Sequence, residues 1–548
     1  MPSPATSSPT RQGKPLDETG RTPPQLQEQI EVAQAAGIIA LGNVTSRVLG
    51  LVREMVKSGL FGAGGDVSAL NAAFRIPTMI YDLLVGGTLG SALVPVLSDF
   101  TAPERRAELW HLLGVLISIA LLVLCGFVLL AEFLAPQVVW LQAGGLSPPY
   151  QALAVDLLRI VLPAVVFLSL ASLISGALYA LKRFTFPAFT VAVFNAALVI
   201  VALALGRRWG VRSMAAGMLV GSALQVLLQL PGLRGAHLRF GLNFHHPALR
   251  RIGRLYLPLL VGLVVDKLAE LLSYNLASRT SDSAISWMEY AAQVIQLPLG
   301  LVVGAVSIAT LPTLSRQAGS DDLDSFRATL ARGLRLVLAL VIPATMGLYV
   351  LANPIVALIF EHGNFAAADT VSTAQALRAA LLGLLFAAVD QPLIFAFYAR
   401  KDTLTPALVG VGTTILYVLM AITPWWLGVL TLPLLVLINS LKLAAHALAM
   451  LALTRYGLGG LRGHGLGPLT LKAALASLVM AGATWGVMRV LAVIAPAGFV
   501  GELLVVGGAG GVGAAVYGFL ALALRIEEIR LLRAAVGDGL KRLTGLGR

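Results

Sequence analysis

Apolar stretches long enough to cross a lipid bilayer recur along almost the whole chain. A membrane-spanning helix needs about 20 mostly apolar residues, and Pro, Gly and charged residues separate such stretches throughout this sequence. The pattern predicts an all-α polytopic membrane protein with about fourteen transmembrane helices. We expect these helices near residues 33–60, 69–98, 110–134, 152–180, 187–205, 212–231, 248–278, 284–311, 328–352, 370–399, 404–425, 430–453, 468–492 and 499–524.

Two pairs of segments repeat at nearly the same spacing. Residues 87–98 (GTLGSALVPVLS) resemble residues 304–315 (GAVSIATLPTLS), and residues 179–189 (YALKRFTFPAF) resemble residues 398–408 (YARKDTLTPAL). The spacing predicts a duplicated unit of six helices, and an even number gives both copies the same orientation, a parallel repeat. Chance similarity among apolar segments is the alternative.

The repeat divides the chain into units. We expect an N-lobe at 33–231, a C-lobe at 248–455 and two further helices at 468–524. Residues 1–32 are rich in polar residues and Pro and contain no apolar core of a signal peptide, so a disordered cytoplasmic tail is expected. Residues 525–548 form a basic tail with helical spacing, which we expect on the inner membrane surface.

Composition supports the membrane class. Hydrophobic residues make up 57% of the 548 residues and charged residues 12%, and the mean hydropathy is +0.84. A soluble protein of this length needs more polar surface than that.

The distribution of basic residues predicts the orientation. Lys and Arg concentrate in the two tails and in alternate loops, whereas the other loops and their edges hold only Arg207, Arg208, Arg212 and Arg279. Cytoplasmic loops carry such an excess, so both termini are expected in the cytoplasm. The formal net charge of +13 then indicates contact with anionic membrane lipids rather than with nucleic acid.

The first predicted helix carries charges that a bilayer disfavours. A charged side chain at the membrane centre costs about 2.5–3.5 kcal/mol on insertion scales. The polar positions of this helix fall within an arc of about 140°, so we expect the stripe to face protein or water. They are Asn43, Ser46, Arg47, Gly50, Arg53, Glu54, Lys57 and Ser58.

Two other helices add charges. The second helix contributes Arg75, and the seventh contributes Asp266, Lys267 and Glu270 on one arc. The N-lobe stripe is net cationic and the C-lobe stripe net anionic, which predicts a hydrated cavity between the lobes. Static ion pairs such as Arg53–Glu54 and Lys267–Glu270 are the alternative.

The surplus of cations predicts an anionic ligand. Arginine binds phosphate well through its forked donors. We therefore expect Arg47, Arg53 and Arg75 to bind a phosphate-bearing lipid, with Lys57, near the outer mouth of the cavity, as a weaker candidate.

Several motifs identify a family resemblance. TSRVLGLVRE, FGAG, AAFRIP and ALVPVLSDF, followed by SWMEYAAQVIQLPLG, IFEHGNF and FYARKDTLTPA, resemble the MurJ (MviN) family of lipid II flippases in the MOP exporter superfamily. The similarity covers roughly residues 35–455. By position, Ser46, Arg47, Arg53 and Glu54 match the family's first-helix motif, and Arg75 matches a basic position in the second helix.

The resemblance implies a function and a location. It implies two six-helix lobes, with two C-terminal helices that form a groove for the lipid tail. It also implies alternating-access transport of undecaprenyl-pyrophosphate-linked peptidoglycan precursor across the bacterial inner membrane, without enzymatic activity. A flippase of another polyprenyl-pyrophosphate oligosaccharide is the main alternative. A membrane enzyme or a scaffold fits less well, and we expect a monomer.

Some positions depart from the family pattern. Ser68, Tyr81 and Gly86 replace residues common in the first lobe, and Gln293 and Gln296 stand where the eighth helix often has Arg and Glu. Asp266, Lys267, Glu270, Gln293 and Gln296 are therefore cavity or coupling candidates. No metal or organic cofactor is expected. The sequence is compatible with transport coupled to Na⁺ and with transport coupled to the membrane potential.

Overall fold

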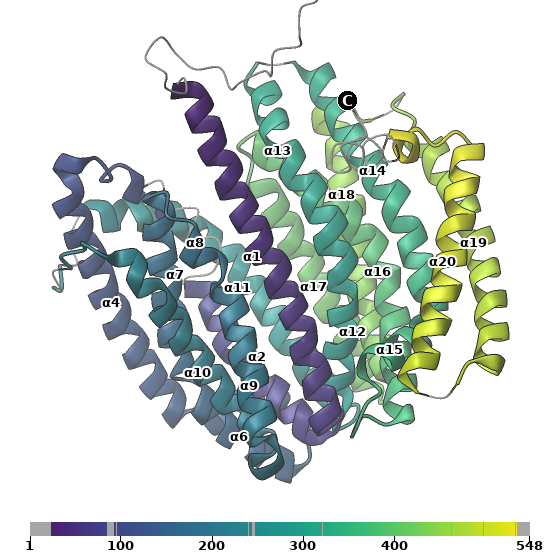
Figure 1. The fold of residues 1–548 in the computed structure, drawn as a ribbon, viewed down its shortest axis with the longest axis horizontal. Coiled ribbons are helices and arrows are strands. Elements are labelled where there is room, and N and C mark those ends of the chain that lie inside the picture. Colours follow the sequence, from purple (N-terminus) through teal and green to yellow (C-terminus); the bar gives the residue numbers. More distant parts are fainter. Residues whose placement is uncertain are drawn as a thin grey trace, which may run out of the picture.

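The chain forms one bundle of helices, seen from the side in Figure 1. The computed structural model describes residues 24–84, 93–94, 96–238, 241–243, 247–320, 322–461, 463–496, 498–531 and 533, and across them it contains helices and no strand. We call the end of the bundle where α1 begins the terminal end, and the other end the opposite end. The described C-terminal part of the chain also lies at the terminal end (Figure 1).

The first helix set runs from α1 to η2. Its long helices are α1 (Pro24–Phe61), α2 (Gly65–Leu84), α4 (Arg106–Phe133), α6 (Pro148–Val161), α7 (Ala164–Ala180), α9 (Thr190–Trp209) and α10 (Arg212–Gln229). Its short elements are η1 (Pro103–Arg105), α5 (Ala135–Ala143), α8 (Thr185–Ala188) and η2 (Leu230–Leu233).

The second helix set runs from α11 to α18 and is followed by a C-terminal pair. It contains α11 (Pro247–Ser278), α12 (Ala284–Pro298), η3 (Leu299–Val303), α13 (Gly304–Gly319), α14 (Leu323–Val350), α15 (Ala352–Phe360), α16 (Ala367–Ala399), α17 (Leu404–Trp426) and α18 (Leu432–Leu458). The pair is α19 (Leu466–Ile494) and α20 (Phe499–Ala523).

The helix bounds repeat along the chain as the sequence motifs do. α4 and α5 span 106–133 and 135–143, and α14 and α15 span 323–350 and 352–360, with the same displacement at all four bounds. The short helices α5 and α15 were not part of the predicted pattern. Their nine residues are too few to cross a bilayer, and each buries one face, including Val139 in α5 and Phe360 in α15.

A criterion of helix length and apolar composition identifies fewer membrane-spanning helices than the fourteen predicted. Among the described residues, nine helices are long and apolar enough to cross a membrane, and the bent pair α6–α7 makes a tenth. This group does not include α1, α2 and α11, which carry the charged side chains of the site described below. It also does not include α12–α13, which is interrupted by η3 and Pro312. The class is confirmed, and the count of fourteen stays a prediction.

Both predicted tails need correction. α1 begins at Pro24, so residues 24–32 are helical rather than disordered; Pro is favoured in a first helical turn, and the Gln, Glu and Leu that follow are good helix formers. After α20 the chain turns at Arg525 and packs Ile526 into a core with α14, α19 and α20. Arg335 on α14 pairs there with Glu527 at 3.2 Å and Glu528 at 2.5 Å. The start of the basic tail is therefore docked on the bundle. Residues 1–23 and 534–548 lie outside the described part.

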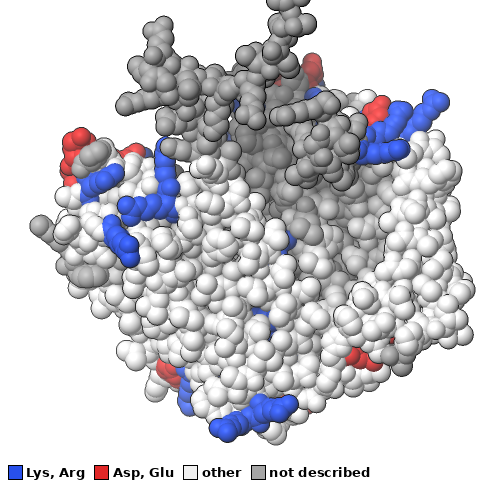
Figure 2. Space-filling model, in the orientation of Figure 1, with Lys and Arg blue, Asp and Glu red and all other residues white. Residues whose placement is uncertain are grey.

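The cores show where the two sets meet. One large cluster joins both sets, with Leu70 and Leu157 from the first and Tyr290 and Phe360 from the second. Towards the terminal end there are two separate clusters: one around Leu113 of the first set, which also takes in Ala248 and Ile252 at the start of α11, and one around Phe326 within the second set. The face shown in Figure 2 is hollowed in its upper part, between the positions that α1 and α14 take in Figure 1. The sets thus share their largest core near the opposite end, and in Figure 1 most of their helices diverge towards the terminal end.

Candidate functional site

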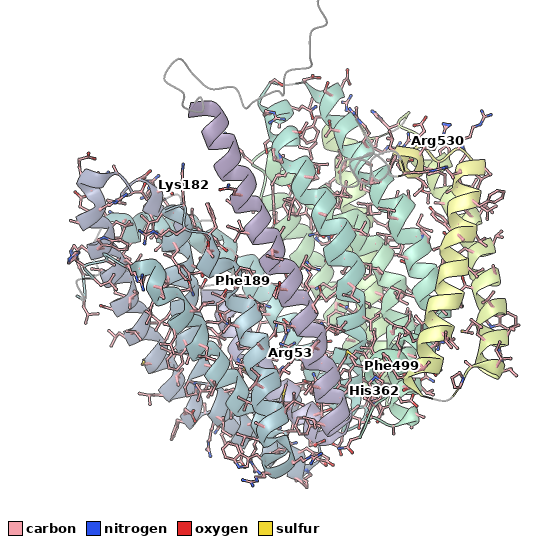
Figure 3. All side chains as sticks on the ribbon, in the orientation of Figure 1. Arg53, Lys182, Phe189, His362, Phe499 and Arg530 are labelled. Carbon is pink, nitrogen blue, oxygen red and sulfur yellow. The ribbon has the colours of Figure 1, made fainter. Side chains whose placement is uncertain are left out.

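α1 carries its polar stripe into the middle of the bundle. Figure 3 labels Arg53 in the lower part of the bundle, towards the end of α1, where this helix passes between the two sets. Glu54 and Lys57 are only 6% and 4% exposed, whereas Val44 and Val48 on the other flank are each 57% exposed. The stripe thus faces protein at Glu54 and Lys57, whereas Asn43 and Arg47, nearer the start of α1, are exposed. The helical arc predicted that the stripe faces protein or water.

A cavity of about 140 Å³ lies beside this stripe. Both helix sets contribute to it, and it contains four of the predicted site residues. Its lining is Arg53, Glu54, Lys57, Asn71, Phe74, Arg75, Thr78, Phe194, Met214, Met218, Tyr274 and Glu289. We call it the central cavity.

Arg53 is held by an acid on its own helix and by an amide from α9. Its Nε and Nη2 donate to Glu54 Oε1 at 3.0 and 2.7 Å, and its Nη1 donates to Asn195 Oδ1 at 3.0 Å. Asn195 donates in turn to the backbone oxygen of Ser46 at 3.1 Å. The Ser46 hydroxyl donates to the backbone of Asn43, so Ser46 joins this network through its carbonyl group.

Lys57 lies deeper than the sequence suggested. Its ammonium pairs with Glu54, donates to Asn71 Oδ1 at 3.1 Å and lies 4.8 Å from the ring centre of Tyr290. Glu54 therefore lies between two cations, Arg53 and Lys57. One positive charge remains uncompensated within this triad.

Four charged groups connect the two sets next to the cavity. Arg75 on α2 pairs with Glu270 on α11. Lys267 on α11 pairs with Asp82 on α2 at 2.7 Å and with Glu270 at 3.2 Å. The pairs Arg53–Glu54 and Lys267–Glu270, raised from the sequence as an alternative, are both present, each within one helix.

Asp266 lies apart from this group. Its side chain is 63% exposed and lies 3.8 Å from the ammonium of Lys442 on α18. That ammonium also lies 6.0 Å from the ring centre of Tyr417. Asp266 thus belongs to a separate polar contact within the second set.

Sequence reasoning missed Glu289, the acid on α12 that lines the central cavity. Within the described chain no hydrogen bond or ion pair holds its carboxylate, although Arg53, Lys57 and Arg75 act on its charge. Its position inside the apolar SWMEYAAQVIQLP segment was the available signal. Gln293 and Gln296 follow one and two turns later on α12, outside the cavity lining, and Gln296 is exposed.

Arg47 lies on the terminal-end side of the central cavity and reaches across to the second set. Its guanidinium lies so close to Gly300 of η3 that a Cβ atom at that position would overlap it. Arg47 is exposed and has no carboxylate partner in the part of the chain described. It is the arginine of the stripe most free to bind a ligand.

Between the central cavity and the opposite end, hydrogen bonds hold the two helix sets together and close that end. Ser68 and Ser286 hydroxyls lie 2.9 Å apart, and Tyr290 donates to the backbone oxygen of Gly62 at 2.9 Å. Asn364 donates from its backbone and side chain to the oxygens of Gly59 and Leu60, at 3.0 and 2.6 Å. Each bond joins the first set to the second.

This closure explains one departure from the family pattern, since Ser68 pairs across the two sets rather than lining the cavity. Tyr81 is half-buried and hydrogen-bonds to Ser172 in the first set. Gly86 lies outside the described residues. The described residues contain no group of three or more His, Cys, Asp or Glu side chains that could hold a metal ion.

Comparison with known proteins identifies relatives over most of the chain. The family model for lipid II flippase MurJ matches residues 57–506. A lipid II flippase MurJ from Burkholderia cenocepacia is 32% identical over 380 residues, which cover 68% of this chain and 74% of the relative. A probable lipid II flippase MurJ from Vibrio cholerae is 32% identical over 406 residues, covering 71% of this chain and 77% of the relative.

Solved structures share the fold. Lipid II flippase MurJ in an inward closed conformation superposes with a TM-score of 0.74 at 24% identity, covering 89% of this chain and 98% of that one. An inward-facing multidrug resistance MATE transporter of the MOP superfamily gives a TM-score of 0.67 at 14% identity, covering 76% of this chain and 95% of its own. The chain therefore belongs to the MurJ family of lipid II flippases.

Proposed function

We propose that this protein moves lipid II from the inner to the outer leaflet of the bacterial plasma membrane. Family membership supports the substrate, and the central cavity supports the mechanism. The observation that carries the proposal is the convergence of Arg53, Lys57 and Arg75 in a cavity built by both helix sets. An anionic pyrophosphate is the ligand that such a group of donors favours.

The orientation follows from the basic residues. The terminal end faces the cytoplasm because positive residues concentrate in the loops and tails on that side. The hydrogen-bonded opposite end then faces outward. In this state the protein is closed to the outside, with its two sets diverging towards the cytoplasm.

Transport proceeds by alternating access between the N-lobe (33–231) and the C-lobe (248–455). The central cavity, at about 140 Å³, is smaller than the roughly 300–1,000 Å³ of typical ligand pockets, so the lobes must separate further to admit the substrate. The pyrophosphate binds Arg47 first and then competes with Glu270 for Arg75. Losing that ion pair weakens the link between α2 and α11, which frees the lobes to rearrange.

The C-terminal pair receives the lipid tail. α19 and α20 present many apolar side chains to the surroundings, such as Leu475 and Val479 at 51% and 57% exposure. Such a surface suits a polyprenyl chain, which needs no polar partner.

The substrate is tested by binding competition. Purified protein in detergent should retain lipid II in native mass spectrometry when an O-antigen-type polyprenyl pyrophosphate is added in equal amount, because the resemblance to the family extends over both lobes. Free pyrophosphate controls for a purely ionic contact. Stronger retention of the competitor would transfer the assignment to an oligosaccharide flippase.

Coupling to the membrane potential is a further part of the proposal. Asp266 and Glu270, the acids considered for Na⁺, already contact internal cations: Lys442 for the first, Arg75 and Lys267 for the second. A net positive cavity that changes sides gains about 2.3 kcal/mol per elementary charge per 100 mV. In proteoliposomes we therefore expect lipid II flipping to accelerate under an imposed potential and to be unchanged by a sodium gradient. Dependence on sodium alone would contradict this mechanism.

A further inference from the structure

A second cavity lies between the C-terminal pair and the second helix set, near the opposite end. It measures about 880 Å³ and is bounded by the end of α14, by α15, α16, α19 and the start of α20. We call it the C-terminal cavity. Its charged and aromatic lining is Tyr349, Glu361, Arg378, Trp485, Arg489 and Glu502. The described linings of this cavity and of the central cavity have no residue in common.

Two arginines in this cavity have aromatic neighbours in place of acids. Arg378 on α16 donates from Nε to the backbone oxygen of Tyr349 at 3.3 Å and lies 6.0 Å from the ring centre of the same residue. Arg489 on α19 lies 5.3 Å from the ring centre of Trp485. Neither guanidinium pairs with a carboxylate within the described chain. Both keep donors for an anion.

Two glutamates lie in the same cavity, and no cation among the described residues forms an ion pair with either of them. Glu361 accepts a hydrogen bond from the Thr370 hydroxyl at 2.5 Å through Oε2. The carboxylate of Glu502, in the first turn of α20, has no hydrogen-bond partner among the residues described, and the charge of Glu361 acts on it repulsively. A ligand cation between them would relieve that repulsion.

The cavity lies at the depth of lipid head groups. Tyr349, Arg489 and Glu502 are all within about 8 Å of the ends of their helices at 1.5 Å per residue. Tyr and Trp are enriched at the membrane–water interface. The walls between the charged groups are apolar, with Val350, Met488 and Val505. The lining thus combines a polar head-group region with an apolar surface.

We propose that the C-terminal cavity binds a zwitterionic phospholipid with a primary ammonium group, namely phosphatidylethanolamine, from the outer leaflet. Arg378 and Arg489 bind its phosphate, and Glu361 and Glu502 accept hydrogen bonds from its ammonium. Two positive and two negative side chains balance, which favours a zwitterion over an anionic lipid.

The bound lipid stabilises the closed opposite end. Glu361 is the first residue of the segment 361–366. Three residues later, Asn364 makes the hydrogen bonds to Gly59 and Leu60 that close this end. Gly363 lies against the Gly59 backbone with φ of +58°, where a side chain would both clash and be strained. The ring of His362 packs against that of Phe499 of α20, with the ring centres 5.8 Å apart and the planes tilted by 59°; both residues are labelled in Figure 3. The segment therefore links the cavity to the closure.

Native mass spectrometry of the delipidated full-length protein tests the site with three defined lipids. Phosphatidylethanolamine should bind ~10-fold or more tightly than phosphatidylcholine, because methylation removes the N–H donors to two charged acceptors. Phosphatidylglycerol, which carries no cation, should also bind more weakly. Glu502→Gln should remove the preference for phosphatidylethanolamine over phosphatidylglycerol, and Arg378→Gln should weaken all three lipids. Glu104→Gln and Arg208→Gln, which change exposed groups elsewhere, should leave the preference intact.

Equal binding of the three lipids would overturn the proposal, since an annular lipid shows no such preference. Tightest binding of phosphatidylglycerol would mean that the glutamates do not act on the ligand. The lipid series uses the unaltered protein, so the test stands even where a variant fails to fold. Arg378→Lys, which keeps the charge, should retain part of the binding.

Discussion

Loss of lipid II transport is the expected result of replacing Arg53 by alanine. Its guanidinium is shared between Glu54 and Asn195 at the wall of the central cavity, where a pyrophosphate would displace one of these partners. Removing hydrogen bonds to a charged group costs about 1.5–3 kcal/mol, which corresponds to roughly 10–100-fold weaker binding. Arg53→Ala should also leave Glu54 with Lys57 as its one cation partner among the described residues. Arg47→Ala should have a similar effect, because this arginine is exposed and has no carboxylate partner among the described residues that a pyrophosphate would have to displace.

The measurement is growth of a cell depleted of its own lipid II flippase, with the amount of each variant in the membrane determined in parallel. Arg53→Lys should restore growth only in part, because an ammonium keeps the charge and loses the forked contact. Arg159→Ala is the matched control, since Arg159 also lies in a membrane helix, exposed and outside the central cavity. Full growth with Arg53→Ala and normal binding of lipid II would remove this residue from the site.

A disulfide across the opposite end should stop transport completely. The hydroxyl oxygens of Ser68 and Ser286 lie 2.9 Å apart, so the two side chains point towards each other, as the cysteines of a disulfide must. In a Cys125→Ala background, the double variant Ser68→Cys, Ser286→Cys should cross-link on oxidation. Because this pair joins the two helix sets on the proposed outer side, the cross-link prevents opening towards the outer leaflet.

The readout is flipping of lipid II in proteoliposomes before oxidation, after oxidation and after reduction. Activity should be lost on oxidation and recovered on reduction, and each single-cysteine variant should be insensitive to both treatments. A cross-linked peptide identified by mass spectrometry confirms that the bond has formed. Flipping at the normal rate by the cross-linked protein would show that this end need not open.

Much of the fold could be predicted from short-range patterns. The length of the apolar stretches fixes the membrane class, because a helix must satisfy its backbone hydrogen bonds across about 30 Å of hydrocarbon. The stripe on α1 follows from 3.6 residues per turn, which places Arg53, Glu54 and Lys57 on one side whatever packs against them. The repeat was visible because two copies kept similar residues at similar positions.

Prediction from local sequence failed where charge and helical spacing both indicated an exposed segment but tertiary packing determined its position. The chain after α20 has the spacing of a surface helix, yet Ile526 is buried and Glu528 pairs with Arg335, 193 positions earlier. The start of α1 was assigned to a tail because its residues are polar, although polar residues such as Gln and Glu are good helix formers.

What the sequence determined by itself was the class of the protein, the helical arcs and the positive character of the first lobe, because these depend on residues that are neighbours along one helix. Only the tertiary structure decided which arcs face each other. It placed Glu289 and Asn71 in the lining of the central cavity and Asn195 against Arg53, paired Arg75 with Glu270 and Ser68 with Ser286, and formed the C-terminal cavity from five separate elements. These contacts join residues up to more than two hundred positions apart, and they arise from the packing of whole helices, which no local periodicity specifies.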